Sequence, residues 1–343
     1  MIIVMQVGAT QAHVEGVVGY LRDQGVEPIV LPGQDNIAIG VPATLDASQR
    51  ISFEALIATL PGVSKVTQTS YPYKLASREW HRENHVVEVK GVRIGECFVV
   101  MAGPCSVESY NQMRAAAEVV KESGAAILRG GAFKPRTSPY AFQGLAEEGL
   151  QILKRIGDEF GLVTISEVMS PDMVEVVAAH VDILQIGARS MQNFPLLIEA
   201  GKSGKPVFLK RGPSATIDEF LLAAEYVLSQ NNPDVILCER GVMPLDRTYV
   251  RNTLDLSAVP VLQEHSHLPV VVDPSHGTGV ARYVQPMALA ALVAGASGVM
   301  IEMHPNPKEA LSDGSQALTP EVFTKLMREL NRVQRALATS LPT

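Results

Sequence analysis

The sequence has few of the residues that mark disulfide-stabilised or nucleic-acid-binding proteins. Its 343 residues include three cysteines, at positions 97, 105 and 238, which is too few for a disulfide framework. Aromatic residues make up 5% of the chain, and no basic run is interleaved with them. Lys and Arg number 29 against 36 Asp and Glu, a formal net charge of −7. We therefore expect no nucleic-acid partner and no binding to an anionic membrane.

The chain also has no apolar run long enough to cross a bilayer. Its opening run, residues 2–7, is too short, and it lacks the basic segment and cleavage site of a secretory signal. We therefore expect a cytoplasmic protein. A hydrophobic fraction of 46% over 343 residues is enough for a large core and for more than one domain.

From residue 97 to the C-terminus, a strand-and-helix pattern repeats eight times. Continuous apolar strands are buried on both faces, as a parallel sheet covered by helices requires. Eight units predict a (β/α)8 barrel over residues 97–343. An open doubly wound sheet is the alternative, and it also gathers polar residues at the strand ends. The predicted strands are residues 98–102, 126–128, 162–165, 183–186, 207–209, 235–237, 270–272 and 299–301.

The first 70 residues predict a separate small domain. Residues 2–7, 27–31, 37–41 and 63–68 have the pattern of strands, and residues 11–23 and 48–60 that of helices. The order β-α-β-β-α-β is that of a ferredoxin-like domain. Residues 71–96 then form a linker and a hairpin, in which 86–89 and 92–94 flank Lys90-Gly91. We expect this hairpin to plug the N-terminal end of the barrel.

Positive residues follow several of the predicted barrel strands, although the chain is acidic overall. Arginine and lysine bind phosphate and carboxylate groups, so a cluster of them on one rim predicts a polyanionic substrate. Any one of them could instead be a structural partner of Glu147, Glu167 or Glu239. The predicted rim cations are Arg129, Lys134, Arg136, Arg189, Lys210, Arg211 and Arg240.

A second group has the character of a metal site. Cys105 follows the first strand, His276 follows the seventh, and Glu302 and Asp313 lie at and after the end of the eighth. Strands one, seven and eight become neighbours when the barrel closes. A thiolate, an imidazole and two carboxylates suit one divalent transition metal, such as Mn, Fe, Co or Zn. Spacing alone leaves open a buried thiol at Cys105 and a catalytic base at His276.

Several segments resemble a known family, the 3-deoxy-D-arabino-heptulosonate 7-phosphate (DAHP) synthases. The similarity is closest to the type I-beta subgroup, which has an N-terminal ferredoxin-like regulatory domain, and it covers essentially the whole chain. The most specific segment is Lys134-Pro135-Arg136-Thr137-Ser138. The others are residues 103–106, 128–133, 185–189, 209–212, 238–241 and 273–276. The resemblance implies condensation of phosphoenolpyruvate with erythrose 4-phosphate and water, the first step of the shikimate pathway.

The resemblance also implies roles for individual residues. It makes Cys105, His276, Glu302 and Asp313 the metal ligands. It assigns phosphoenolpyruvate to Arg129, Lys134, Arg189, Lys210 and Arg240, and the aldose phosphate to Arg136, Thr137 and Ser138. We expect Lys134 to deliver a proton to the aldehyde oxygen, so Lys134, Cys105 and His276 are the predicted catalytic residues. The base that activates water stays open among Glu167, Glu239, Asp273 and His276.

For the N-terminal domain the resemblance implies regulation. Tyrosine or phenylalanine would bind residues 1–70 at a subunit interface of a homotetramer and inhibit the barrel. A passive oligomerisation element is the alternative.

Three other functions compete with DAHP synthesis. One is 3-deoxy-D-manno-octulosonate 8-phosphate synthesis from arabinose 5-phosphate on a similar barrel. Another is a metal-free aldolase with a Schiff base on Lys210. The last is an effector-binding barrel that has lost its activity.

Overall fold

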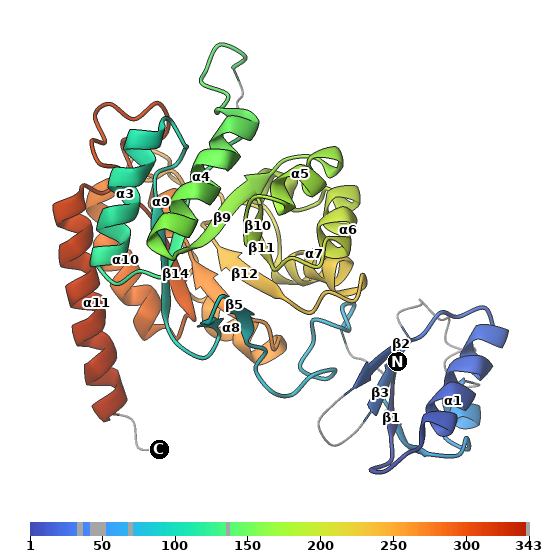
Figure 1. The fold of residues 1–343 in the computed structure, drawn as a ribbon. Helices are drawn as coiled ribbons and strands as arrows, with labels where there is room; N and C mark the ends of the chain where they lie inside the picture. The colour runs from blue at the N-terminus through green and yellow to red at the C-terminus, as the bar shows by residue number, and fades with distance from the viewer. Residues whose placement is uncertain (33–36, 42–52, 68–70, 135–137, 341–343) are drawn as a thin grey trace. The chain divides into compact units, whose positions relative to one another are not determined.

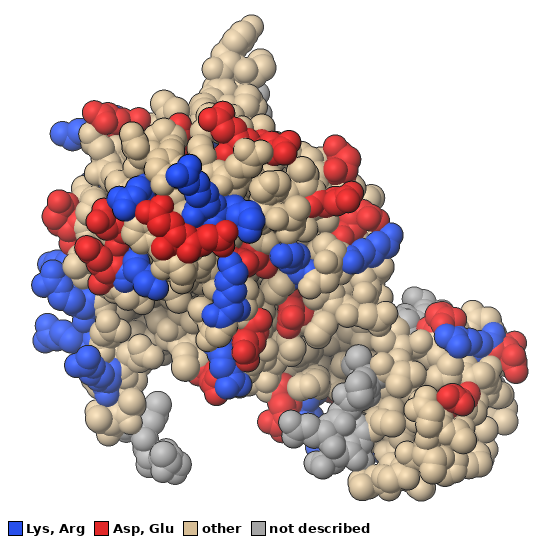
Figure 2. Space-filling model, in the orientation of Figure 1, with Lys and Arg blue, Asp and Glu red and all other residues tan. Residues whose placement is uncertain are grey.

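The computed structural model describes residues 1–32, 37–41, 53–67, 71–134 and 138–340. The chain divides into two compact units, Met1–Glu83 and Asn84–Thr343 (Figure 1). Acidic and basic side chains are interspersed over the visible face of the larger unit (Figure 2). Among the helices of the described residues, none combines the length and the apolar character that crossing a lipid bilayer requires.

The first unit contains the predicted ferredoxin-like fold. Its four strands pair antiparallel in the order β2-β3-β1-β4. They are β1 (Ile2–Met5), β2 (Ile29–Pro32), β3 (Ile37–Gly40) and β4 (Val63–Thr67). Helix α1 (Gln11–Asp23) begins at a capping box of Thr10 and His13, and its buried face packs on the sheet. Residues 53–57 are helical, and residues 48–52 of the second predicted helix lie outside the described residues.

The segment after β4 packs within this first unit. Trp80, the sole tryptophan, is 8% exposed. Its indole ring covers Gly40 in β3 so closely that a Cβ at Gly40 would come within 1.9 Å of a ring carbon. The described residues between β4 and Glu83 are therefore part of the first unit.

The second unit is the predicted eight-stranded parallel barrel. Neighbouring strands pair in parallel, and β14 closes the barrel against β7. The strands are β7 (Val99–Gly103), β8 (Ile127–Arg129), β9 (Val163–Val168), β10 (Ile183–Ile186), β11 (Val207–Lys210), β12 (Val235–Glu239), β13 (Val270–Val272) and β14 (Gly298–Glu302). Every residue of β7, β8, β10, β11, β12, β13 and β14 is buried, as expected for strands covered by helices.

Helices surround the barrel. They are α3 (Tyr110–Glu122), α4 (Ala146–Phe160), α5 (Val174–Ala178), α6 (Phe194–Lys202), α7 (Ile217–Leu228), α8 (Ala258–His265), α10 (Ala281–Val293) and α11 (Pro320–Ser340). A short helix, α9 (Pro274–Thr278), follows β13, and 3-10 turns occupy Pro171–Met173 and Ala188–Ser190. Loops at the C-terminal strand ends alternate with these helices and can carry the site.

A hairpin of β5 (Val87–Val89) and β6 (Val92–Ile94) precedes the barrel. Lys90 and Gly91 both have positive φ, 47° and 81°, which suits a two-residue turn of type I′. The buried side chains of the hairpin share one apolar cluster with residues that begin barrel strands, including Val99, Val163 and Ile183. The hairpin therefore covers the N-terminal end of the barrel and leaves the C-terminal end accessible.

Candidate active site

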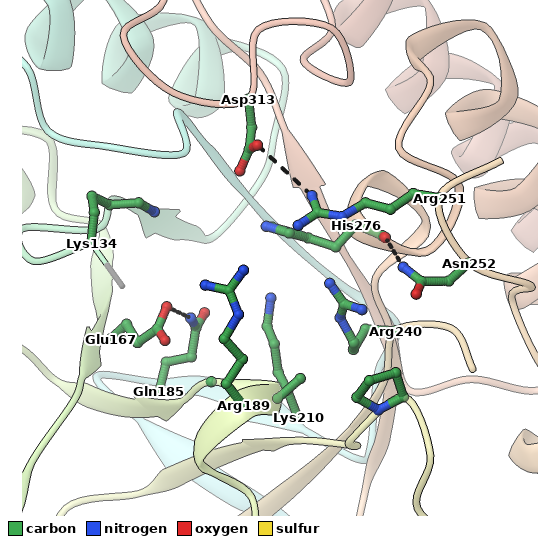
Figure 3. Close-up of a pocket in the computed structure, with 13 residues that line it drawn as sticks. Lys134, Glu167, Gln185, Arg189, Lys210, Arg240, Arg251, Asn252, His276 and Asp313 are labelled. Atoms are coloured by element: carbon green, nitrogen blue, oxygen red, sulfur yellow. Dashed lines mark hydrogen bonds and ion pairs between the residues drawn. The ribbon is translucent and has the colours of Figure 1, made fainter. Parts of the chain in front are cut away.

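A polar pocket of about 260 Å³ lies at the C-terminal ends of the barrel strands. Its cations come from the loop after β8, the ends of β10, β11 and β12, and the loop after β12. Two carboxylates and one imidazole also line it, so positive charge dominates. The labelled residues of Figure 3 are Lys134, Glu167, Gln185, Arg189, Lys210, Arg240, Arg251, Asn252, His276 and Asp313.

Four potential metal ligands converge at one side of this pocket. The side-chain donor atoms of Cys105, His276, Glu302 and Asp313 all lie within 4.8 Å of one another. Cys105 Sγ is 3.3 Å from Asp313 Oδ2, and His276 Nε2 is 3.2 Å from Glu302 Oε1. We call these four residues the quartet. They come from the loop after β7, from α9, and from the end of β14 and the loop beyond it.

Burial and neighbouring charges set the protonation of the quartet. Burial raises the pKa of the Cys105 thiol to about 11, Glu302 adds to this rise, and Lys134 opposes it. Burial also lowers the pKa of His276. Burial opposes the ionisation of Glu302 and Asp313, but the protonated form of His276 at acidic pH, together with Arg129 near Glu302 and Arg251 near Asp313, outweighs it, so both pKa values are lowered. Two carboxylates, a neutral imidazole and a protonated thiol therefore face one another at neutral pH.

Asp273 connects the quartet to the cations of the pocket. Its Oδ2 atom accepts hydrogen bonds from His276 Nδ1, at 2.8 Å, and from Lys210 Nζ, at 2.6 Å. Its Oδ1 atom caps α9 by accepting from the His276 backbone N–H. Asp273 is fully buried, yet His276 and Lys210 hold its pKa well below the usual range against the cost of burial. One carboxylate thus fixes both the imidazole and the ammonium group.

Arg129 is a second buried cation that is paired with a carboxylate of the site, that of Glu302. Its Nη1 atom donates to Glu302 Oε1 at 2.7 Å and to the Pro104 carbonyl at 2.9 Å. Gln316 Nε2 donates to the other Glu302 oxygen at 2.5 Å. The Nε atom of Arg129 is buried and has no hydrogen-bond partner among the described residues. A buried donor of this kind is expected to face an acceptor that is supplied from outside the chain.

The remaining predicted site residues fall into different groups. Arg189, Lys210 and Arg240 line the pocket. Ser138 is exposed, and its hydroxyl accepts from the Tyr140 backbone N–H at 3.3 Å. Arg136 and Thr137 lie outside the described residues.

One of the seven predicted rim cations, Arg211, has a structural role instead. Its guanidinium is buried and contacts Glu239 and Asp255, each at 2.9 Å. Its Nε atom donates to the Ala215 carbonyl. These contacts make Arg211 the structural partner of Glu239 that the sequence left as an alternative.

Three polar residues that line the pocket had been given no role from the sequence. Gln185 lies within β10, where a polar residue inside an apolar run was an available signal. Arg251 and Asn252 lie far along the loop between β12 and α8. No spacing rule places them, because packing decides the path of that loop.

The barrel and the whole chain match known proteins. The phospho-2-dehydro-3-deoxyheptonate aldolase of Thermotoga maritima is 43% identical over 338 residues, which are 98% of both chains. A family model described as the DAHP synthetase I family matches residues 82–339. The chain belongs to the DAHP synthetase I family. A second model, described as the DAHP synthase ferredoxin-like domain, matches residues 1–70.

Solved structures agree with this membership of the DAHP synthetase I family. The crystal structure of the Thermotoga maritima enzyme, a DAHP synthase, is 43% identical and superposes with a TM-score of 0.78 over 98% of this chain and 97% of that one. A truncated form from the same organism is 44% identical, with a TM-score of 0.72, and covers 77% of this chain and 97% of its own.

More distant relatives are 2-dehydro-3-deoxyphosphooctonate aldolases, which correspond to the octulosonate alternative. The 2-dehydro-3-deoxyphosphooctonate aldolase of Syntrophobacter fumaroxidans is 33% identical over 267 residues, 72% of this chain and 91% of that protein. Both the identity and the coverage are lower than for the Thermotoga enzyme, so the comparisons favour DAHP synthase over the octulosonate alternative.

Proposed function

We propose that this DAHP synthase condenses phosphoenolpyruvate with erythrose 4-phosphate at the pocket described above. Carbon 3 of phosphoenolpyruvate bonds to the aldehyde carbon, water adds at carbon 2, and phosphate leaves with cleavage of its C–O bond. The observation that carries the proposal is the meeting of the quartet and a cluster of cations in one pocket of about 260 Å³.

We infer that the quartet binds one divalent transition metal of the Mn, Fe, Co or Zn class. The donor set fits, because a thiol, an imidazole and two carboxylates lie within 4.8 Å of one another and each accepts or donates a hydrogen bond that orients it. When bound, such a metal polarises a carbonyl oxygen as a Lewis acid.

The buried cations are proposed to bind phosphoenolpyruvate. Arg129, Lys210 and Lys134 are 3%, 3% and 6% exposed, and charge-assisted contacts strengthen in such a site. With Arg189 and Arg240 they would offset the repulsion between two phosphorylated substrates. Holding both substrates in a reactive orientation supplies a large part of the rate.

Lys134 is the proposed proton donor. Its ammonium group lies 3.0 Å from Cys105 Sγ, so a proton on Nζ is available to an aldehyde oxygen that approaches the quartet. Of the four residues proposed to activate water, Glu167 and His276 line the pocket. Glu239 is instead enclosed by Arg211 and two backbone N–H groups.

We further propose that the ferredoxin-like domain binds tyrosine or phenylalanine and inhibits the barrel in a homotetramer. Support comes from the match of residues 1–70 to the DAHP synthase ferredoxin-like domain. Activity of the full chain measured with each amino acid, beside analytical ultracentrifugation, tests this. Unchanged activity with both amino acids would refute the regulatory role.

Phosphate release from phosphoenolpyruvate tests the proposed reaction directly. We expect release that depends on erythrose 4-phosphate, that is much weaker with arabinose 5-phosphate, and that stops with a chelator. Faster release with arabinose 5-phosphate would favour the octulosonate reaction. Activity that survives chelation and is trapped by borohydride would favour a Schiff base on Lys210.

A further inference from the structure

We propose that Arg251 is a substrate-binding residue that contacts the aldose phosphate and not phosphoenolpyruvate. This role rests on the proposed function, and it adds a cation that none of the expected substrate contacts includes. Arg251 lies in the loop between β12 and α8 and lines the pocket beside Asp313 and His276 (Figure 3).

Among the residues that the structure describes, the guanidinium of Arg251 makes only long contacts. Its Nη1 atom is 3.8 Å from Asp313 Oδ1 and 3.4 Å from Gln316 Oε1. The first distance is too long for a hydrogen bond, and the second is near the limit. The side chain is 40% exposed, whereas the Arg129 side chain is 3% exposed. Arg251 therefore keeps most of its hydrogen-bonding capacity for a ligand.

Unlike Lys210 and Arg129, Arg251 has no carboxylate within hydrogen-bonding distance among the described residues. Lys210 has Asp273 at 2.6 Å, and Arg129 has Glu302 at 2.7 Å. The carboxylate nearest to Arg251 belongs to Asp313, whose other oxygen contacts Cys105 within the quartet. A metal held by the quartet would draw on that same carboxylate, which leaves the charge of Arg251 available to an anion.

The backbone under Arg251 is fixed in place. Its N–H donates to the Thr278 carbonyl at 2.8 Å, and the N–H of Asn252 donates to the Gly277 carbonyl at 3.1 Å. A Cβ at Gly279 would meet Arg251 Cβ at 2.6 Å, so only glycine allows this approach. The segment thus lies directly against α9, which carries His276. A positioned arginine loses less conformational entropy on binding than one on a mobile loop.

Depth in the pocket indicates which substrate Arg251 contacts. Of the five cations assigned to phosphoenolpyruvate, Arg129, Lys134, Lys210 and Arg240 are at most 9% exposed, whereas Arg189 is exposed. Arg251 is nearer the solvent than the four buried cations, and it also lines a second hollow of about 370 Å³ that opens beside the pocket. A substrate that lies above phosphoenolpyruvate would meet Arg251 with its phosphate or hydroxyl oxygens. In this chain that substrate is the aldose phosphate.

Steady-state kinetics with both substrates varied test this role. For Arg251→Gln we expect the KM for erythrose 4-phosphate to rise at least about tenfold, because a charge-assisted contact is lost. The KM for phosphoenolpyruvate should stay within about twofold, and the metal affinity measured by calorimetry should be unchanged. Arg251→Lys, which keeps the charge but loses the planar fork, should recover part of the affinity.

Arg282→Gln is the matched control. Arg282 is exposed at the start of α10 and lines neither the pocket nor the second hollow, so the variant removes one positive charge outside the proposed aldose site. We expect its kinetic constants to match those of the unaltered chain. An unchanged KM for the aldose in Arg251→Gln would overturn the role, as would a parallel rise in the KM for phosphoenolpyruvate or a loss of metal affinity. Failure of the unaltered chain to use erythrose 4-phosphate would instead refute the proposed function itself.

Discussion

The Nζ atom of Lys134 donates a hydrogen bond to Cys105 Sγ at 3.0 Å and another to the Cys105 carbonyl oxygen at 2.9 Å. One ammonium group therefore fixes both the side chain and the backbone of a quartet residue. The positive charge favours the thiolate, but burial and Glu302 outweigh it, and the thiol pKa is about 11. The thiol keeps its proton at neutral pH in the metal-free chain.

Metal binding should therefore release the proton of the Cys105 thiol. A thiol must lose its proton to become a ligand, whereas Glu302 and Asp313 have lowered pKa values and are already ionised, and His276 is already neutral. Between about pH 7 and 9 we expect about one proton released for each metal ion and an affinity that rises about tenfold per pH unit. Calorimetric titrations with Zn²⁺ in buffers of different ionisation enthalpy measure this. Release of no proton would contradict a protonated Cys105.

Replacing Cys105 by alanine should remove metal-supported turnover. Loss of a ligand weakens a Lewis acid that contributes several kcal/mol, so kcat should fall by about a thousandfold or more. Cys97→Ala is the control, because Cys97 is an exposed thiol away from the quartet. Equal activity of the two variants, or full activity of the unaltered chain in a chelator, would rule out the metal role.

Asp273→Asn should weaken both metal binding and the binding of phosphoenolpyruvate. The amide oxygen of asparagine can still cap α9, but asparagine has only that one acceptor oxygen. In the unaltered chain, the two carboxylate oxygens of Asp273 accept hydrogen bonds from Lys210 Nζ and from two nitrogens of His276. We expect metal affinity to fall by about 10- to 100-fold and the KM for phosphoenolpyruvate to rise about tenfold. Calorimetry and initial rates measure the two effects separately.

Asp182→Asn is a suitable control for that variant. Asp182 accepts hydrogen bonds from Thr164 and pairs with Lys90 at the hairpin end of the barrel. Its replacement should lower the thermal unfolding midpoint without changing either the metal affinity or the KM. If both variants changed only the midpoint, Asp273 would be purely structural.

Gly40→Ala should displace Trp80 from the ferredoxin-like unit. The new Cβ would lie 1.9 Å from one ring carbon and 2.1 Å from another, so the ring must move. We expect a loss of about 1–3 kcal/mol in the free energy of unfolding of this unit, with a shift in the fluorescence of the sole tryptophan. Gly16→Ala in α1 meets nothing within 4 Å and should instead stabilise by about 0.5–1 kcal/mol. Unchanged fluorescence in Gly40→Ala would contradict the observed packing.

The fold could be predicted from local pattern to within a few residues at the ends of its elements. The sequence places the strand before Cys105 at residues 98–102, and β7 is Val99–Gly103. Apolar periodicity determines such elements because a strand covered on both faces must be apolar throughout. Chain order then brings the first, seventh and eighth strands together, so the approach of Cys105 to His276 could be inferred from a closed barrel.

Charge partners and long loops could not be predicted in this way. Arg211 comes directly after Lys210 at the end of β11, yet it contacts Glu239 and Asp255 while Lys210 lines the pocket. Arg251 reaches the same pocket from a distant loop. The sequence by itself determined the barrel and the strand ends that carry its chemistry. The tertiary structure decided which charges neutralise one another and which face the ligand, because those outcomes depend on distances of a few ångströms between residues far apart in the chain.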